Sequence, residues 1–124
     1  MITSSLEDYL ELIYNLIEQN KLVKAVDIAA KFSVSRSSVS EALIRLADMD
    51  LIIYEGRKGI KITQKGIEQA KITVRKHAIL SEFFEKVLKV NHDVAEKNAC
   101  KIEHVIDEEI IKNMHTLIKK HEQH

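Results

Sequence analysis

Six side chains of the types that bind divalent metal ions are spread over three stretches of the chain. They are Asp8, Glu11, His77, Cys100, Glu103 and His104. The last three are spaced i, i+3 and i+4, so in a helix they share one face. The first two lie three residues apart, so both carboxylates would also project from one helical face. A thiolate, carboxylates and imidazoles together form a donor set that suits divalent transition metals.

Each of these residues also has an ordinary structural explanation. Asp8 and Glu11 could be solvated acids that favour the dipole at the start of a helix. A lone cysteine such as Cys100 is often a small buried residue, and a lone histidine such as His77 often lies at the surface. From the residues alone, the Cys-x-x-Glu-His cluster is the more specific signal, and the others gain weight only beside it.

Helices should position these side chains, because apolar residues recur at helical spacing and the chain has no proline and only three glycines. Ser4 with Glu7 and Asp93 with Glu96 have the spacing of helix caps, and Thr63 is a further N-cap candidate. The expected helices run from Ser4 to about Asn20, over 26–32, over 36–49, from Thr63 to about Val90, from Asp93 to Val105, and onward from Asp107.

A helix-turn-helix is predicted where two of these helices meet. Ile28 and Ala29 would pack the first helix, Ser33 would occupy the turn, and Val39 and Ala42 would face inward from the second helix. The N-terminal part of such a second helix normally enters the major groove of DNA. We expect DNA contacts from this end, through the residues Ser35, Arg36, Ser37, Ser38 and Ser40. For any one serine, capping of the helix is an equally good explanation.

A β-hairpin follows this second helix directly. The residues 51–54 favour a strand, 55–59 a turn, and 60–63 a returning strand, since their side chains alternate. In this position the hairpin is the wing of a winged helix-turn-helix. Arg57 and Lys58 at its tip would lie beside the phosphate backbone.

Charge is distributed unevenly along a chain whose formal net charge is zero. The first 20 residues carry four acids and no Lys or Arg, whereas residues 21–76 carry twelve bases and six acids. A basic middle segment is expected where one part of a protein faces phosphates. The single cysteine excludes an internal disulfide framework and fits a reducing compartment. With no apolar run long enough to span a bilayer and no signal segment, we expect a cytoplasmic protein without a membrane partner.

Taken together, these residues resemble the diphtheria-toxin-repressor and manganese-transport-regulator (DtxR/MntR) family of metal-dependent repressors, from about Glu7 to at least Ile110. The matching features are the segments 7–11 with 13–14, 27–29, 37–39, 51–52 into the wing, Thr63-x-x-Gly66, 75–77 and 100–104. The resemblance implies a mainly α protein. A winged helix-turn-helix over 1–72 would be followed by an all-helical metal-binding and dimerisation domain over 73–124.

By this resemblance, the six residues named first are metal ligands. The set is a hybrid, because Asp8 and Glu11 match the manganese-regulator branch whereas Cys100 matches the iron-responsive branch. A thiolate is a soft ligand, so the sequence favours Fe(II) as cofactor, with Mn(II) close behind. We expect one ion per subunit. The family often has a carboxylate just after the histidine turn for a second ion, but here Leu80 and Ser81 occupy those places.

The function implied is that of a homodimer that binds double-stranded operator DNA and represses metal-uptake genes when metal is bound. Metal would fix the first helix relative to the later ones and so set the spacing of the two recognition helices. An enzyme is not expected, because no nucleophile–base pair or phosphate loop is present. The alternatives are a winged-helix regulator that senses a small organic molecule and a non-regulatory metal-binding protein. His121 and His124 are expected to be solvated residues, not ligands.

Overall fold

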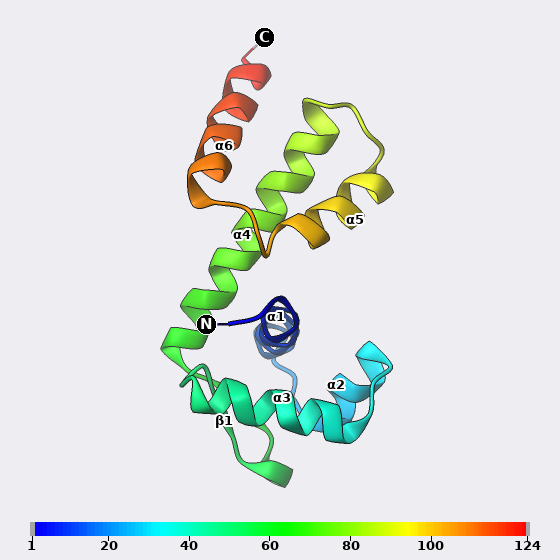
Figure 1. Ribbon diagram of the computed structural model, residues 1–124, viewed down its shortest axis with the longest axis vertical. Coiled ribbons are helices and arrows are strands. Elements are labelled where there is room, and N and C mark those ends of the chain that lie inside the picture. The colour runs from blue at the N-terminus through cyan, green and yellow to red at the C-terminus, as the bar shows by residue number, and fades with distance from the viewer. Residues whose placement is uncertain (1, 124) are drawn as a thin grey trace. The chain divides into compact units, whose positions relative to one another are not determined.

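The computed structural model describes residues 2–123, which contain six α-helices and one two-stranded sheet (Figure 1). The helices are α1 (Ser4–Glu18), α2 (Ala25–Phe32), α3 (Arg36–Asp48), α4 (Gln64–Lys86), α5 (His92–Ile102) and α6 (Glu108–Glu122). Strands β1 (Ile52–Tyr54) and β2 (Ile60–Ile62) flank a short 3₁₀ turn, Gly56–Lys58. The chain divides into two compact units after Lys71, and α4 continues from the first into the second.

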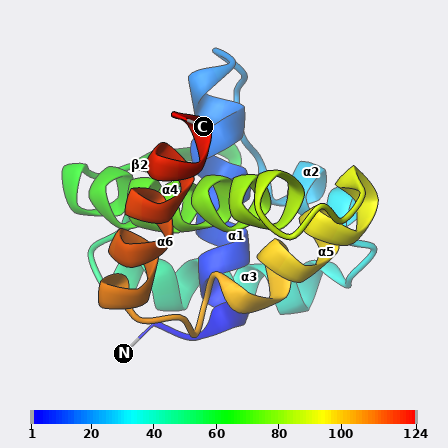
Figure 2. The same ribbon diagram turned by 90° about the horizontal axis from the view of Figure 1, so that it is seen from above.

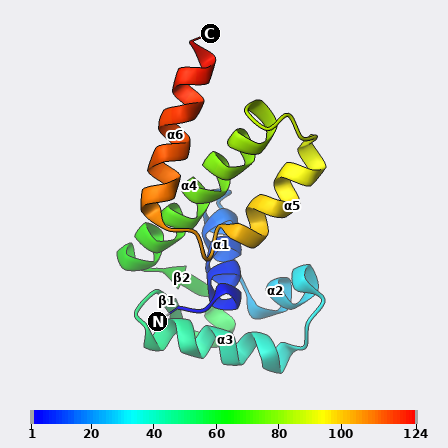
Figure 3. The ribbon, with the colours of Figure 1, turned by 45° about the horizontal axis from the view of Figure 1, so that its top comes forward.

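The first unit packs α1, α2, α3 and the hairpin around one apolar core. Ile13, Ile28, Val39 and Leu43 are fully buried there, so the residues predicted to hold the helix-turn-helix together do so. The hairpin is antiparallel, with Ile53 opposite Lys61. Figure 3 shows the short connection that carries the chain from α2 into α3.

The second unit consists of the main part of α4 with α5 and α6 on either side of it (Figure 2). Its core is smaller and contains Leu80 from α4, Ala99 from α5, and Ile111 and Ile118 from α6, all of them buried. His121 lies exposed on α6, as expected, and His124 lies outside the described residues.

Two helices begin at caps other than the predicted ones. Thr3, not Ser4, is the N-cap of α1, and its side chain accepts a hydrogen bond from the Leu6 amide. Asn91, not Asp93, is the N-cap of α5 and accepts from the Val94 amide. In both places two nearby residues have side chains that can cap a helix, and the helix begins after the earlier of the two. Asp107 is the N-cap of α6 as predicted.

Several helices end in a left-handed residue that is not glycine. These residues are Asn20, Ser33, Asp50 and Lys89, with φ angles between 54° and 62°. The helix α4 ends at Lys86 instead of near Val90, because the amides of Val87 and Leu88 both return to the Phe83 carbonyl. The chain then turns through Lys89 toward α5.

Thr63 and Gly66 attach the start of α4 to the hairpin. The Thr63 hydroxyl donates to the Asp50 carbonyl (2.7 Å) and accepts from the Gly66 amide (3.0 Å), so it caps α4 as predicted. A Cβ atom on Gly66 would lie 2.0 Å from the Leu51 carbonyl oxygen. The Thr-x-x-Gly spacing therefore allows a close contact that no larger residue permits.

Candidate metal centre and nucleic-acid interface

His77 lies between two carboxylates in the second unit. Its Nδ1 is 2.7 Å from Glu103 Oε2, and its Nε2 is 2.8 Å from Glu96 Oε2. Glu96 comes from α5 and Glu103 is the residue that caps the end of α5, whereas His77 comes from α4. The imidazole of His77 thus meets the two carboxylates where α4 and α5 lie beside each other.

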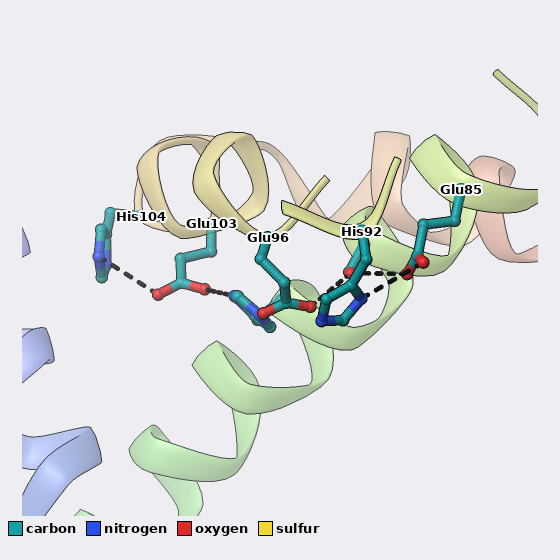
Figure 4. Close-up of polar contacts among 7 residues, drawn as sticks. Glu85, His92, Glu96, Glu103 and His104 are labelled. Carbon is teal, nitrogen blue, oxygen red and sulfur yellow. Dashed lines mark hydrogen bonds and ion pairs between the residues drawn. The ribbon is translucent and has the colours of Figure 1, made fainter. Parts of the chain in front are cut away.

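Glu103 is the buried centre of this group. Its side chain is only 1% exposed, and its second oxygen, Oε1, lies 3.4 Å from Nε2 of His104. Figure 4 shows the polar contacts running from His104 and Glu103 past Glu96 to His92 and Glu85. A buried carboxylate between two imidazoles is costly unless the charge is paired, and it offers nitrogen and oxygen donors that fit a divalent transition metal.

The protonation of His77 is governed by two opposing effects. Burial lowers the pKa of this imidazole, but the hydrogen bonds to Glu96 and Glu103 raise it and outweigh the burial, so its pKa is above the usual value. The pKa of Glu96 is lowered, first by the hydrogen bond from Ser81 and then by the bond to His77. The two carboxylates therefore favour the protonated form of His77.

The remaining predicted ligands lie at different places. Cys100 is exposed on α5. Asp8 and Glu11 are half-buried on α1 in the first unit, where they share one face as predicted. Within the second unit, the structure brings together His77, Glu103 and His104.

Sequence reasoning missed Glu96 as a partner of His77. Glu96 and Glu103 are seven residues apart, which is about two helical turns, so the sequence does indicate that both point to the same side. Ser81, which donates to Glu96 Oε1 at 2.7 Å, carries no such signal, because its partner is on another helix.

The recognition helix α3 begins with the predicted serines. Ser35 is its N-cap, accepting from the Ser38 amide at 3.1 Å, so the capping explanation holds for this residue. Arg36, Ser37 and Ser38 are exposed on the first turn. Ser40 is partly buried beside a groove of about 360 Å³.

This groove runs between α3 and the hairpin within the first unit. Lys24, Arg36 and Arg57 line it, together with Tyr54 and Ser40. Arg57 and Lys58 lie exposed at the tip of the hairpin, as predicted for a wing. Three basic side chains around an open groove provide the positive potential that phosphate groups require.

The second unit also exposes apolar side chains. Ile111 is in the unit's own core, and Phe83, Phe84 and Val87 pack partly against it. Leu88, Val105, Ile110 and Leu117 are between 46% and 74% exposed. None of the helices in residues 2–123 combines the length and apolar character needed to cross a bilayer.

Comparison with protein-family models gives two matches that together span almost the whole chain. Residues 1–60 match the model described as "Iron dependent repressor, N-terminal DNA binding domain". Residues 63–124 match "Iron dependent repressor, metal binding and dimerisation domain".

Individual relatives agree with these models. The chain is 33% identical over 120 residues to an uncharacterized HTH-type transcriptional regulator of Methanocaldococcus jannaschii, covering 96% of both chains. It is 35% identical over 119 residues to the HTH-type transcriptional regulator MntR of Shouchella clausii, covering 96% of this chain and 82% of that one. Among solved structures, the manganese regulator SloR matches with a TM-score of 0.81 and 30% identity over 92% of this chain.

The chain spans about half of the SloR chain, 53% of its length. The DNA-binding model, the metal-binding and dimerisation model and the full-length relatives confirm the expected resemblance and fold class. The chain belongs to the iron-dependent repressor (DtxR/MntR) family of metal-dependent transcriptional repressors.

Proposed function

We propose that this protein is a homodimeric repressor whose affinity for double-stranded operator DNA rises when it binds a divalent transition metal. The observation that carries the proposal is the buried carboxylate of Glu103, which has an imidazole at each of its oxygens. A site that exists to bind a cation explains why two histidines and a carboxylate converge inside a small helical unit.

The proposed ligand set contains all six residues expected from the sequence. Geometry supports three of them, namely His77, Glu103 and His104. The family's ligand pattern supports the other three, namely Asp8, Glu11 and Cys100. A bound ion would supply concentrated positive charge to this donor set. The protein's part is to orient the donors, which the bonds between His77 and its two carboxylates do.

We further propose Mn(II) as the preferred ion, in place of the Fe(II) that the sequence favoured. The donors that converge in the second unit are carboxylate and imidazole, and carboxylates suit manganese. The soft thiolate of Cys100, which was the argument for iron, is exposed on α5. The relatives named MntR and the manganese regulator SloR support this choice.

DNA recognition is assigned to the first turn of α3 and to the wing. Arg36, Ser37, Ser38 and Ser40 would contact the major groove, with Ser35 at the helix start. Arg57 and Lys58 would contact phosphates from the wing. The exposed apolar residues of the second unit would be buried in a homodimer, as the matched dimerisation model suggests.

The metal half of this proposal is tested by calorimetry on the anaerobic, metal-free protein. We expect Mn(II) and Fe(II) to bind, and Glu103→Gln to weaken Mn(II) binding by about tenfold or more. Glu109→Gln is the matched control, because it removes the same charge from an exposed position on α6. If no divalent ion binds the wild-type protein more tightly than about 1 mM, the metal-repressor proposal fails.

The DNA half is tested by selecting a duplex from a random library in the presence of Mn(II) and measuring its affinity with and without the ion. We expect tighter binding with Mn(II) and a smaller gain in Glu103→Gln. Equal affinity in both conditions would instead favour a regulator that senses an organic ligand.

The choice of metal is tested separately with Cys100→Ser. If the oxygen and nitrogen donors set the preference for manganese, this variant loses less affinity for Mn(II) than for Fe(II). A loss of Mn(II) affinity as large as the loss of Fe(II) affinity would make the thiolate decisive and return the preference to Fe(II).

A further inference from the structure

Three consecutive residues of α4 each contact the segment that joins α5 to α6, residues 103–108. The contacts are His77 Nδ1 with Glu103 Oε2, Lys76 Nζ with the Ile106 carbonyl oxygen, and Arg75 with Glu108. All of these residues lie within the second unit. His77 has a place in the proposed ligand set, whereas the proposed function gives the two bases before it no role.

The joining segment carries two of the proposed ligands, Glu103 and His104. Its backbone turns tightly, because the amides of Val105 and Ile106 both donate to the Ile102 carbonyl, at 2.9 and 3.1 Å. The side chains of Glu103 and His104 are 1% and 6% exposed. In a turn this tight, a shift of the Ile106 peptide also moves the backbone that aims these two side chains.

Lys76 holds this turn from another helix. Its ammonium donates to the Ile106 carbonyl at 2.9 Å in a partly buried hydrogen bond. A hydrogen bond from a charged donor is stronger than one between neutral groups, and it strengthens further where water is partly excluded. The bond therefore links α4, which carries His77, to the backbone that follows His104.

Arg75 makes a weaker contact with the same segment. Its ion pair with Glu108 joins side chains that are 44% and 43% exposed. Ion pairs this exposed contribute little, because water and salt screen the two charges. Of the two bases, Lys76 therefore makes the contact that can fix the joining segment.

The charge of Lys76 by itself acts against metal binding, because an ammonium beside a cation site repels the ion. Removing this charge would strengthen metal binding if repulsion were its main effect. Removing the hydrogen bond would weaken metal binding if the bond keeps the turn in place. The two effects have opposite signs, so an affinity measurement separates them.

We propose that Lys76 is a positioning residue, which keeps Glu103 and His104 aimed at the ion that His77 also binds. This inference rests on the proposed function, because it concerns the same metal site. Residues that orient metal ligands from behind typically change metal affinity by roughly 10- to 100-fold when they are removed.

The test measures the Mn(II) affinity of variants of the full chain by anaerobic calorimetry. Lys76→Met keeps the apolar stem and removes both the donor and the charge, and we expect about tenfold weaker binding. Lys76→Arg keeps a charged donor and should stay within about threefold of the wild type. Lys97→Met removes the same charge from an exposed position on α5 and should leave the affinity unchanged or slightly higher.

Amide hydrogen exchange of the metal-free protein supplies a second readout. In Lys76→Met the amides of Val105 and Ile106 should exchange about tenfold faster, because the turn opens more often without its anchor. Lys97→Met should leave their exchange unchanged. If Lys76→Met does not fold, Lys76→Gln takes its place, because its side chain is polar but shorter by one bond.

An Mn(II) affinity that is unchanged or higher in Lys76→Met would overturn the proposal, and so would an equal loss in Lys97→Met. Faster exchange with unchanged Mn(II) affinity would also overturn it, since Lys76 would then only stabilise the turn. Failure of the proposed function gives a different result, because the wild type itself would then not bind Mn(II), and the role of Lys76 would fall with it.

Discussion

At the scale of single residues, His77 is the side chain whose charge state matters most. It is held between Glu96 and Glu103, so the imidazole is stabilised as a cation when no metal is present. A metal ion must displace this proton, so metal binding should release protons and weaken as the pH falls.

A change at Glu96 should reveal this coupling. In Glu96→Gln the hydrogen bond to Nε2 loses its charge, so the pKa of His77 should fall toward its usual value. The measurement is an NMR titration of the His77 ring in the metal-free protein, with Glu82→Gln as control. An unchanged pKa of His77 would mean that Glu103 alone raises it.

The same pair gives a pH window of stability. The pKa of His77 is raised in the folded state, so the protonated imidazole adds to the free energy of unfolding below its unfolded pKa. This stabilisation is lost as pH rises through the folded pKa. Because the pKa of Glu96 is lowered, its contribution is present above its unfolded pKa and is lost as pH falls through the folded pKa. Denaturant melts of the metal-free protein should show this pair stabilising most in weakly acidic solution.

Ser35 and Arg36 are neighbours that we expect to differ in role. Ser35 caps α3, so Ser35→Ala should cost about 1 kcal/mol of unfolding free energy. Arg36→Ala should leave stability nearly unchanged and weaken operator binding, because its side chain is exposed beside the basic groove. Denaturant melts and DNA titrations of both variants would contradict this assignment if Arg36→Ala proved the more destabilised.

At the scale of elements, the start of α4 depends on one close contact. Gly66→Ala would force its Cβ against the Leu51 carbonyl, and we expect a loss of about 3 kcal/mol despite the better helix propensity of alanine. Gly56→Ala is the comparison, since its Cβ meets nothing within 4 Å and only the positive φ costs about 1 kcal/mol. Similar losses in chemical denaturation would contradict the steric explanation.

The elements themselves were largely predictable, because apolar residues such as Leu10, Ile13 and Val39 recur at helical spacing and are buried. Their ends were not. The apolar residues 87–90 suggested that α4 continues, but the chain turns at Lys89 without a glycine to mark the turn. In the site, the pairing of His77 with Glu96 escaped prediction because it depends on how α4 packs against α5.

At the scale of the whole molecule, the comparisons confirm that the protein is a regulator and not an enzyme, as the sequence predicted. Linkage then makes a quantitative demand on the proposed function. If Mn(II) raises operator affinity by some factor, operator DNA must raise Mn(II) affinity by the same factor. Metal titrations with and without the selected duplex measure this factor, and a Mn(II) affinity that the duplex leaves unchanged would contradict the proposed coupling.

Operator binding should also depend on salt in a way that identifies the wing. Arg57→Ala should reduce the slope of log affinity against log salt by about 1, with little change in sequence preference. Lys112→Ala, at an exposed position on α6, should leave the slope unchanged. If both variants behave alike, the basic groove is not the phosphate-binding surface.

The left-handed residues at the helix ends offer a route to a more robust protein for laboratory use. Ser33, Asp50 and Lys89 adopt a conformation in which a side chain is strained and glycine is not. Replacing Asp50 and Lys89 with glycine would relieve that strain without touching the groove, and each change should raise the melting temperature. Because the chain has only three glycines, substitution by glycine at these helix ends is a simple way to raise its thermostability.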